Sequence, residues 1–162
     1  MRLPNWSDDA QAVCACTFGR SDDICNKAIA CHVAVIAMEH KLPFCVQGEI
    51  GAYLDKSLLG YRSAESSDVH HREYVGTYET VHEQVTCYLQ PQRITKIHVE
   101  AHPEHAWRMV MCYRHFGMEV VSVCTMGKPY PPASTQVWCR SKFRFVPYEV
   151  LARLLYVAKG YM

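Results

Sequence analysis

The sequence contains no long apolar run, and this absence excludes a membrane-spanning protein. No window approaches the roughly 18 apolar residues that cross a bilayer. Residues 1–9, M-R-L-P-N-W-S-D-D, also lack the apolar core of a secretory signal peptide. We therefore expect a protein with no membrane partner, and we expect it to be cytoplasmic.

An excess of charge of either sign is also absent. The chain has 17 basic and 16 acidic residues, which give a net formal charge of +1 with neutral histidines. Binding to nucleic acid depends on a surplus of positive charge facing the phosphates. Residues 138–144, W-C-R-S-K-F-R, are the one aromatic and basic stretch. We expect no nucleic-acid partner.

The nine cysteines lack the spacing of metal or disulfide motifs. Cys14 and Cys16 are too close together, because zinc sites favour pairs separated by two to four residues. Their number is odd, and most of them lie in apolar runs. We interpret them as small buried residues of a protein in a reducing cytosol. A rival metal site would combine His102 and His105 with Glu100, but we expect no metal.

The residues that are present indicate one globular domain. Hydrophobic residues make up 49% of the chain and charged residues 20%, as in ordinary globular proteins. A length of 162 residues suits a single domain over 1–162, and no internal repeat is evident. We expect residues 1–10 to be a poorly ordered lead-in. The polar residues 60–76 predict a long loop, which would act as a mobile lid or be disordered.

Hydrophobic periodicity predicts strands that alternate with helices. Two buried strands are predicted at 11–18 and 43–47, with a helix at 23–41 between them. A helix capped by Thr77 is followed by a strand at 97–101, by a helix from Pro103 to Gly117 and by a strand at 120–123. Pro147 opens the last predicted helix. The order predicts an α/β fold of three α/β/α layers around a mostly parallel, Rossmann-like sheet.

Polar residues follow several of the predicted strands, at the edge where open α/β sheets bind ligands. Helix N-termini at this edge carry partial positive charge and unpaired N–H groups. Arg20 and Arg108 add positive charge at the same edge. Together with the helix N-termini, they predict a site for a phosphate or carboxylate. The predicted ligand-binding residues are Gly19, Arg20, Gly48, Glu49, Thr77, Glu79, His102 and Arg108, with His105 as the catalytic candidate.

Each predicted role has a simpler alternative. Arg108 would clamp the anion, or be one partner of an ordinary ion pair. His105 would donate a hydrogen bond or act as an acid and base, or be a structural histidine. Thr77 and Glu79 would orient the ligand from the start of a helix, where both residue types are also common stabilisers. His102 would contact the ligand or only cap the helix.

The stretch from 102 to 120, H-P-E-H-A-W-R-M-V-M-C-Y-R-H-F-G-M-E-V, resembles the late motif of the YdcF/SanA-like family. In that family a strand ends in a Thr-Ser-Pro-x-His loop, and an arginine-bearing helix and a glycine follow. The segment G-T-Y-E-T at 76–80 is similar to the Asn-Thr-x-Glu-Asn start of another helix of the family. The tail at 147–160, with Glu149 and Tyr156, is also similar. The family's glycine-rich first loop is reduced here to Gly19 followed by Arg20.

The resemblance implies a Rossmann-like fold with a cleft above the sheet. It selects Thr77, Glu79, His105 and Arg108 as site residues, and it raises S-adenosylmethionine or a nucleotide as the ligand. We therefore expect a small-ligand-binding protein with a nucleotide- or phosphate-type site. A hydrolase or transferase acting on a phosphorylated or sugar substrate is the alternative, and a structural protein with a vestigial site is the third hypothesis.

Overall fold

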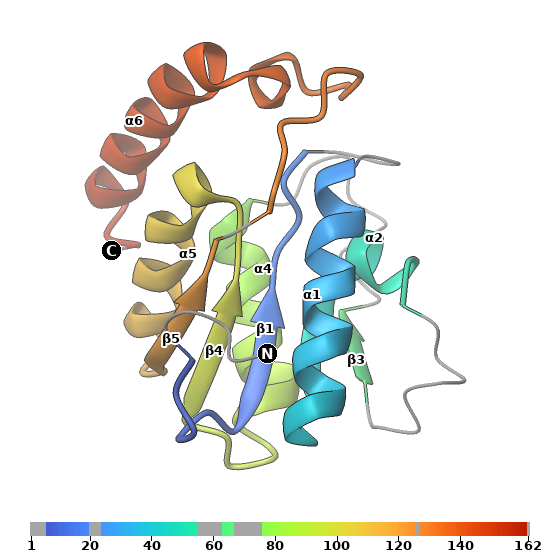
Figure 1. Cartoon of the computed structure of the whole chain (residues 1–162). Helices are drawn as coiled ribbons and strands as arrows, with labels where there is room; N and C mark the ends of the chain where they lie inside the picture. The colour runs from blue at the N-terminus through green and yellow to red at the C-terminus, as the bar shows by residue number, and fades with distance from the viewer. Residues whose placement is uncertain (1–5, 20–23, 55–62, 67–75, 126, 162) are drawn as a thin grey trace.

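The computed structural model describes residues 6–19, 24–54, 63–66, 76–125 and 127–161. Within these residues, five strands form one parallel sheet in the order β3-β2-β1-β4-β5. Figure 1 shows the sheet with the carboxyl ends of the strands at the top. The strands are β1 (Ala12–Ala15), β2 (Phe44–Gln47), β3 (Ser63–Ser66), β4 (Lys96–Glu100) and β5 (Glu119–Cys124). The predicted α/β fold with a parallel sheet is confirmed.

The order of the strands reverses beside β1. From β1 the chain runs through α1 (Ile24–His40) to β2, and α2 (Gly48–Gly51) follows before β3. It returns through α4 (Thr77–Glu83) and the π-helical segment η2 (Gln84–Leu89) to β4, on the other side of β1. Then α5 (Pro103–His115) leads to β5. The carboxyl ends of β1 and β4 therefore form the switch point at which open α/β sheets bind ligands.

Strand β1 is apolar throughout because both of its faces are buried. Ala12 and Cys14 belong to a core cluster with residues of α4, η2 and α5, whereas Val13 and Ala15 belong to a second cluster with residues of α1. Successive side chains of a strand point to opposite faces of the sheet. Helical side chains therefore pack against both faces of β1.

The cysteines are mostly core residues, as predicted. All nine are free, and seven are buried. Cys31 and Cys87 are the two exposed exceptions. Burial raises the pKa of Cys14 and of Cys112 to about 12, so these thiols stay protonated at neutral pH.

A buried glutamine connects η2 to the sheet. The amide nitrogen of Gln84 donates to the carbonyl oxygens of Ala15, at 3.1 Å, and of Cys45, at 3.5 Å. Its amide oxygen accepts a hydrogen bond from the Tyr113 hydroxyl on α5. Gln84 therefore bonds two neighbouring strands and a helix at once.

Two predicted boundaries were wrong, and the predicted loop contains an unexpected strand. Residues 63–66, placed in that loop, form β3, which has the polar sequence S-A-E-S and pairs with β2 at one edge of the sheet that the described residues form. Residues 55–62 and 67–75 of that region lie outside the described residues. The last helix, α6 (Lys142–Ala158), begins before Pro147 and contains it. The N-cap of α4 is Gly76 rather than Thr77.

The outer face of α6 is apolar. Phe143 is 93% exposed, Leu151 67% and Leu154 63%, whereas Phe145, Glu149, Ala152 and Tyr156 on the opposite face are buried. Figure 1 shows α6 beyond the carboxyl edge of the sheet, beside α5. Among the helices in the described residues, none combines the length and apolar content needed to cross a bilayer.

Candidate functional site

Aromatic side chains fill the switch point between β1 and β4. The rings of Phe18, which follows β1, and His102, which follows β4, stack with centroids 3.7 Å apart. Tyr130 contacts the edges of both rings, and Phe145 of α6 packs against Phe18. His102 is 1% exposed and Phe18 2%. The described residues therefore close the place where the sequence predicts a ligand cleft.

His102 is buried without the hydrogen bonds that a histidine usually makes. Its Nδ1 lies 3.1 Å from an oxygen of Glu104, but neither ring nitrogen has a hydrogen-bond partner of acceptable geometry among the described residues. Burial lowers the pKa of His102 to about 4. The ring is therefore neutral at pH 7. His102 is the N-cap residue of α5 by backbone position, but its side chain does not cap the helix.

Gly19, Gly48 and Glu49, which were predicted to follow β1 and β2, are not among the residues that line a pocket beside α6. Gly19 has a φ of 89° and makes the turn after Phe18. Gly48 and Glu49 form the start of α2. Arg20 lies outside the described residues.

Thr77, His105 and Arg108 do come together, although their helices are separated by β4 in the sequence. The Thr77 hydroxyl lies 3.3 Å from His105 Nε2, and His105 Nδ1 lies 3.1 Å from Nη2 of Arg108. A guanidinium only donates hydrogen bonds, so His105 Nδ1 is the acceptor and Nε2 carries the proton. His105 is therefore a neutral ring that connects α4 to Arg108. Burial and the charge of Arg108 lower its pKa in agreement with this state.

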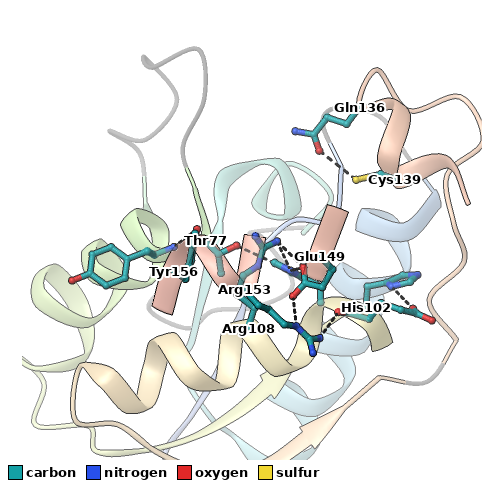
Figure 2. Close-up of polar contacts among 11 residues, drawn as sticks. Thr77, His102, Arg108, Gln136, Cys139, Glu149, Arg153 and Tyr156 are labelled. Atoms are coloured by element: carbon teal, nitrogen blue, oxygen red, sulfur yellow. Dashed lines mark hydrogen bonds and ion pairs between the residues drawn. The ribbon is translucent and has the colours of Figure 1, made fainter. Parts of the chain in front are cut away.

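Arg108 is neutralised by a carboxylate from α6. Its Nη2 lies 3.1 Å from an oxygen of Glu149, and both residues are almost completely buried. Figure 2 shows the two side chains pointing toward each other, with Arg153 on the other side of the carboxylate. Arg153 Nε donates to Glu149 Oε1 at 3.1 Å. Arg108 is therefore an ion-pair partner, as the simpler alternative for this residue predicts.

The contact between Arg108 and Glu149 favours the charged form of each residue. Burial alone would raise the pKa of Glu149, but contacts with Arg108 and Arg153 lower it. Burial alone would lower the pKa of Arg108, and the charge of Glu149 outweighs that effect. The rings of Tyr148 and Tyr156 lie 5.7 and 5.3 Å from the guanidinium carbon, within cation–π range.

A pocket of about 530 Å³ lies beside this group, between the start of α4, α5 and α6. Its volume is within the usual range for small-molecule sites. Arg108 and Glu79 line it, whereas the described residues at the switch point do not. The lining residues are Gly76, Glu79, Arg108, Tyr148, Leu151, Ala152, Leu155, Tyr156, Lys159 and Tyr161.

One buried hydrogen-bond donor of Arg108 has no partner among the described residues. The residue is 5% exposed, and its Nε has no hydrogen-bond partner among the described residues. A buried donor without a partner costs about 1–3 kcal/mol. An acceptor on a bound molecule would remove this cost once neighbouring side chains moved to expose Nε.

A second polar group surrounds Glu100, at the carboxyl end of β4. Glu100 Oε2 lies 2.6 Å from Lys128 Nζ and 3.5 Å from His32 Nδ1, and Oε1 lies 3.0 Å from His98 Nε2. Burial alone would raise the pKa of Glu100, but these contacts lower it to about 2. Glu100 is therefore ionised, and it does not converge with His102 and His105 as the rival metal site would require.

Sequence reasoning missed most partners of the two groups. Arg153 has a recognisable signal, because Glu149 and Arg153 have the i, i+4 spacing of a helical ion pair. His32 is the one polar residue in the run I-A-C-H-V-A-V at 29–35. Lys128 and Cys124 carry no local signal, because only the tertiary structure brings them to Glu100.

No protein-family model, curated protein or solved structure matches the chain.

Proposed function

We propose that this protein binds a small molecule in which an anionic group lies close to an aromatic ring, as in a nucleotide. The observation that supports this proposal most directly is the unused Nε donor of Arg108. Arg108 lines the pocket of about 530 Å³ beside α6. A phosphate or carboxylate oxygen would accept this hydrogen bond, and guanidinium groups bind both kinds of anion well.

The charges around the pocket favour an anion. Arg108, Arg153 and Lys159 supply three positive charges, and Glu79 and Glu149 supply two negative charges. One positive charge is left over. Because Arg108 is almost completely buried, its attraction to a ligand is screened less by salt than that of a surface cation.

The pocket also suits an aromatic ring. Three tyrosines line it: Tyr148, Tyr156 and Tyr161. Tyrosine rings stack on nucleobases, and each such contact contributes about 1–3 kcal/mol to binding. S-adenosylmethionine is a candidate because its adenine could stack on these rings, its carboxylate could bind Arg108 and its amine could bind Glu79.

We further propose that the fold is a three-layer, Rossmann-like one of the YdcF/SanA-like type. The strand order β3-β2-β1-β4-β5 supports the Rossmann-like class. Thr77, His105 and Arg108, which the resemblance selects, form one hydrogen-bonded group, and this supports the relation to the family. Nine free cysteines support a reducing compartment such as the cytoplasm.

We assign His105 a positioning role rather than a catalytic one. Both of its ring nitrogens are engaged, by Thr77 and by Arg108, and His105 is not among the described residues that line the pocket. A hydrolase or transferase would need an acid or base that reaches the substrate. The geometry therefore supports binding better than catalysis.

Ligand-induced thermal stabilisation tests this proposal. The ligands are adenosine monophosphate, S-adenosylmethionine, adenosine and inorganic phosphate. A ligand at 100 times its dissociation constant should add about 2.7 kcal/mol of stability. We expect adenosine monophosphate to stabilise more than adenosine or phosphate alone. If none of the four shifts the melting temperature, the proposal is wrong.

Three variants test whether the ligand binds in this pocket. Leu155→Trp should fill the pocket and weaken binding, while the contact between Arg108 and Glu149 stays intact. Arg108→Lys keeps the charge but removes Nε, and should weaken binding at least tenfold. Arg114→Lys, on the exposed side of the same helix, is the matched control and should leave binding unchanged. Binding that survives both pocket variants would show that the ligand lies elsewhere.

A further inference from the structure

Three potential metal ligands converge at the carboxyl edge of the sheet, away from the proposed ligand pocket. They are His32 Nδ1 from α1, Glu100 Oε2 from the end of β4 and Cys124 Sγ from the end of β5. All three atoms lie within 4.8 Å of one another. Glu100 and Cys124 are buried, whereas the side chain of His32 is 28% exposed. Solvent therefore reaches the group from the side of His32.

The arrangement does not fit a nucleophilic cysteine activated by a histidine. In such a group one ring nitrogen faces the thiol and the other faces the carboxylate. Here Nδ1 of His32 faces both, at 3.9 Å from Cys124 Sγ and 3.5 Å from Glu100 Oε2. Three ligand atoms that lie within 4.8 Å of one another suit a shared metal ion better.

Two of the three separations between ligand atoms lie near those of a zinc site, and the third, between Glu100 Oε2 and Cys124 Sγ, is at most 4.8 Å. Zinc is bound tetrahedrally at about 2.0–2.2 Å by nitrogen or oxygen and about 2.3 Å by sulfur, so neighbouring ligands lie roughly 3.3–3.6 Å apart. The separation of His32 Nδ1 and Glu100 Oε2 is 3.5 Å, and that of His32 Nδ1 and Cys124 Sγ is 3.9 Å. The ligand atoms would have to draw closer together to bind one zinc ion.

A positive charge already lies among the three ligands. Lys128 Nζ is 2.6 Å from Glu100 Oε2, 3.2 Å from His32 Nδ1 and 3.9 Å from Cys124 Sγ. The ammonium group is completely buried. Lys128 Nζ therefore lies beside all three potential metal ligands.

Residues behind Glu100 hold its carboxylate in position. His98 Nε2 lies 3.0 Å from Glu100 Oε1, and His98 Nδ1 lies 2.7 Å from the Ser122 hydroxyl on β5. His98 is completely buried. Contacts of this kind orient metal ligands, and their loss typically lowers metal affinity by about 10–100-fold.

From these observations we infer that His32, Glu100 and Cys124 form a binding site for zinc or a similar transition-metal ion, with Lys128 as the cation that holds the site when no metal is bound. Thiolate, imidazole and carboxylate ligands together suit zinc and cobalt. Three protein ligands leave a fourth position open to solvent, as in reactive zinc sites. The sequence predicts no metal site, so this inference departs from that expectation.

Cobalt binding followed by absorption spectroscopy tests this inference. The parent protein is the full chain with Cys31→Ser and Cys87→Ser, because these two thiols are exposed and could bind metal by themselves. Addition of Co²⁺ should produce a thiolate-to-cobalt charge-transfer band, and Zn²⁺ should abolish it by competition. Cys124→Ser should remove the band, and Ser122→Ala should lower the affinity at least fivefold.

Lys128→Met gives the second test. It removes the competing ammonium group, so the affinity for Co²⁺ should rise at least tenfold. Circular dichroism establishes that each variant is folded. The inference is overturned if neither the parent nor the Lys128→Met protein produces the band, or if the band persists in Cys124→Ser.

Discussion

The Arg108 guanidinium and the Glu149 carboxylate approach to 3.1 Å, and both residues are almost completely buried. Arg108 comes from α5 and Glu149 from α6, so their ion pair joins these two helices. A buried charge is tolerated only when a partner compensates it. The position of α6, and with it the wall of the pocket, therefore depends on this pair.

Removal of one member of the pair should be much worse than removal of both. Glu149→Leu leaves Arg108 buried without its partner and should lower the free energy of unfolding by about 3–5 kcal/mol. In the double variant Arg108→Met and Glu149→Leu, apolar side chains of similar length occupy the same space. Most of the loss should be recovered, as measured by urea unfolding.

The control for this pair is Arg114→Met, an exposed position of the same helix, which should change stability by less than about 0.5 kcal/mol. Equal destabilisation in the double variant and in Glu149→Leu would contradict the account of a compensated buried charge.

His102 should make the protein sensitive to acid. Its pKa is about 4 in the folded chain, below the ordinary value of about 6.5 that it regains on unfolding. Between these values the unfolded chain binds the proton more readily, so stability falls as pH decreases from 6.5 to 4. The loss attributable to His102 should be on the order of 2–3 kcal/mol.

His102→Phe should remove this acid sensitivity. Phenylalanine keeps the stacking on Phe18 and removes two buried nitrogens that lack partners. At pH 7 the variant should be at least as stable as the natural chain. The measurement is the free energy of unfolding at a series of pH values with a chelator present, and His82→Phe, at an exposed position, is the control. Parallel curves for the natural chain and His102→Phe would refute the prediction.

We expect that position 117 favours glycine only because its backbone is in the left-handed conformation. Its φ is +81°, and an added Cβ would meet no atom within 4 Å. Gly117→Ala should therefore cost about 1–2 kcal/mol through left-handed strain. Gly117→Asn should cost less, because asparagine enters this conformation more readily. Equal thermal stability of the two variants would argue against this explanation.

Tyr113 and Gln84 should depend on each other energetically. The Tyr113 hydroxyl donates to the Gln84 amide oxygen, and the other contact of that oxygen is the Cys16 thiol at 4.0 Å. Tyr113→Phe should therefore cost about 1–3 kcal/mol. A double-mutant cycle with Gln84→Met should give a coupling energy of at least 0.5 kcal/mol. Simple additivity of the two changes would show that the hydrogen bond is not significant.

Local sequence patterns predicted the elements whose signals are local. The helix predicted at 23–41 is α1, Ile24–His40, because its apolar residues recur with helical spacing. Pro103 and Gly117 bound α5 and its turn as predicted, because proline suits a first turn and glycine suits a left-handed end. Strand β3 was missed, because an edge strand needs no apolar run.

The start of α6 was misplaced because proline was taken as the opening residue of the helix. Phe145, before Pro147, is buried against Phe18 and packs the first turn of α6 onto the core. A contact between residues so far apart in the sequence leaves no local pattern. The same limit applies to the metal ligands, which come from three separate elements.

Residue patterns were enough to predict an alternating α/β chain with a parallel sheet, and the family resemblance selected Thr77, Glu79, His105 and Arg108. These conclusions depend on periodicity, on helix ends and on a short motif, all of which are local. Three features came from the folded chain alone: Phe18 and His102 close the switch point, Glu149 pairs with Arg108, and the pocket lies beside α6. These features leave no local pattern, because burial and charge compensation depend on which distant segments pack together.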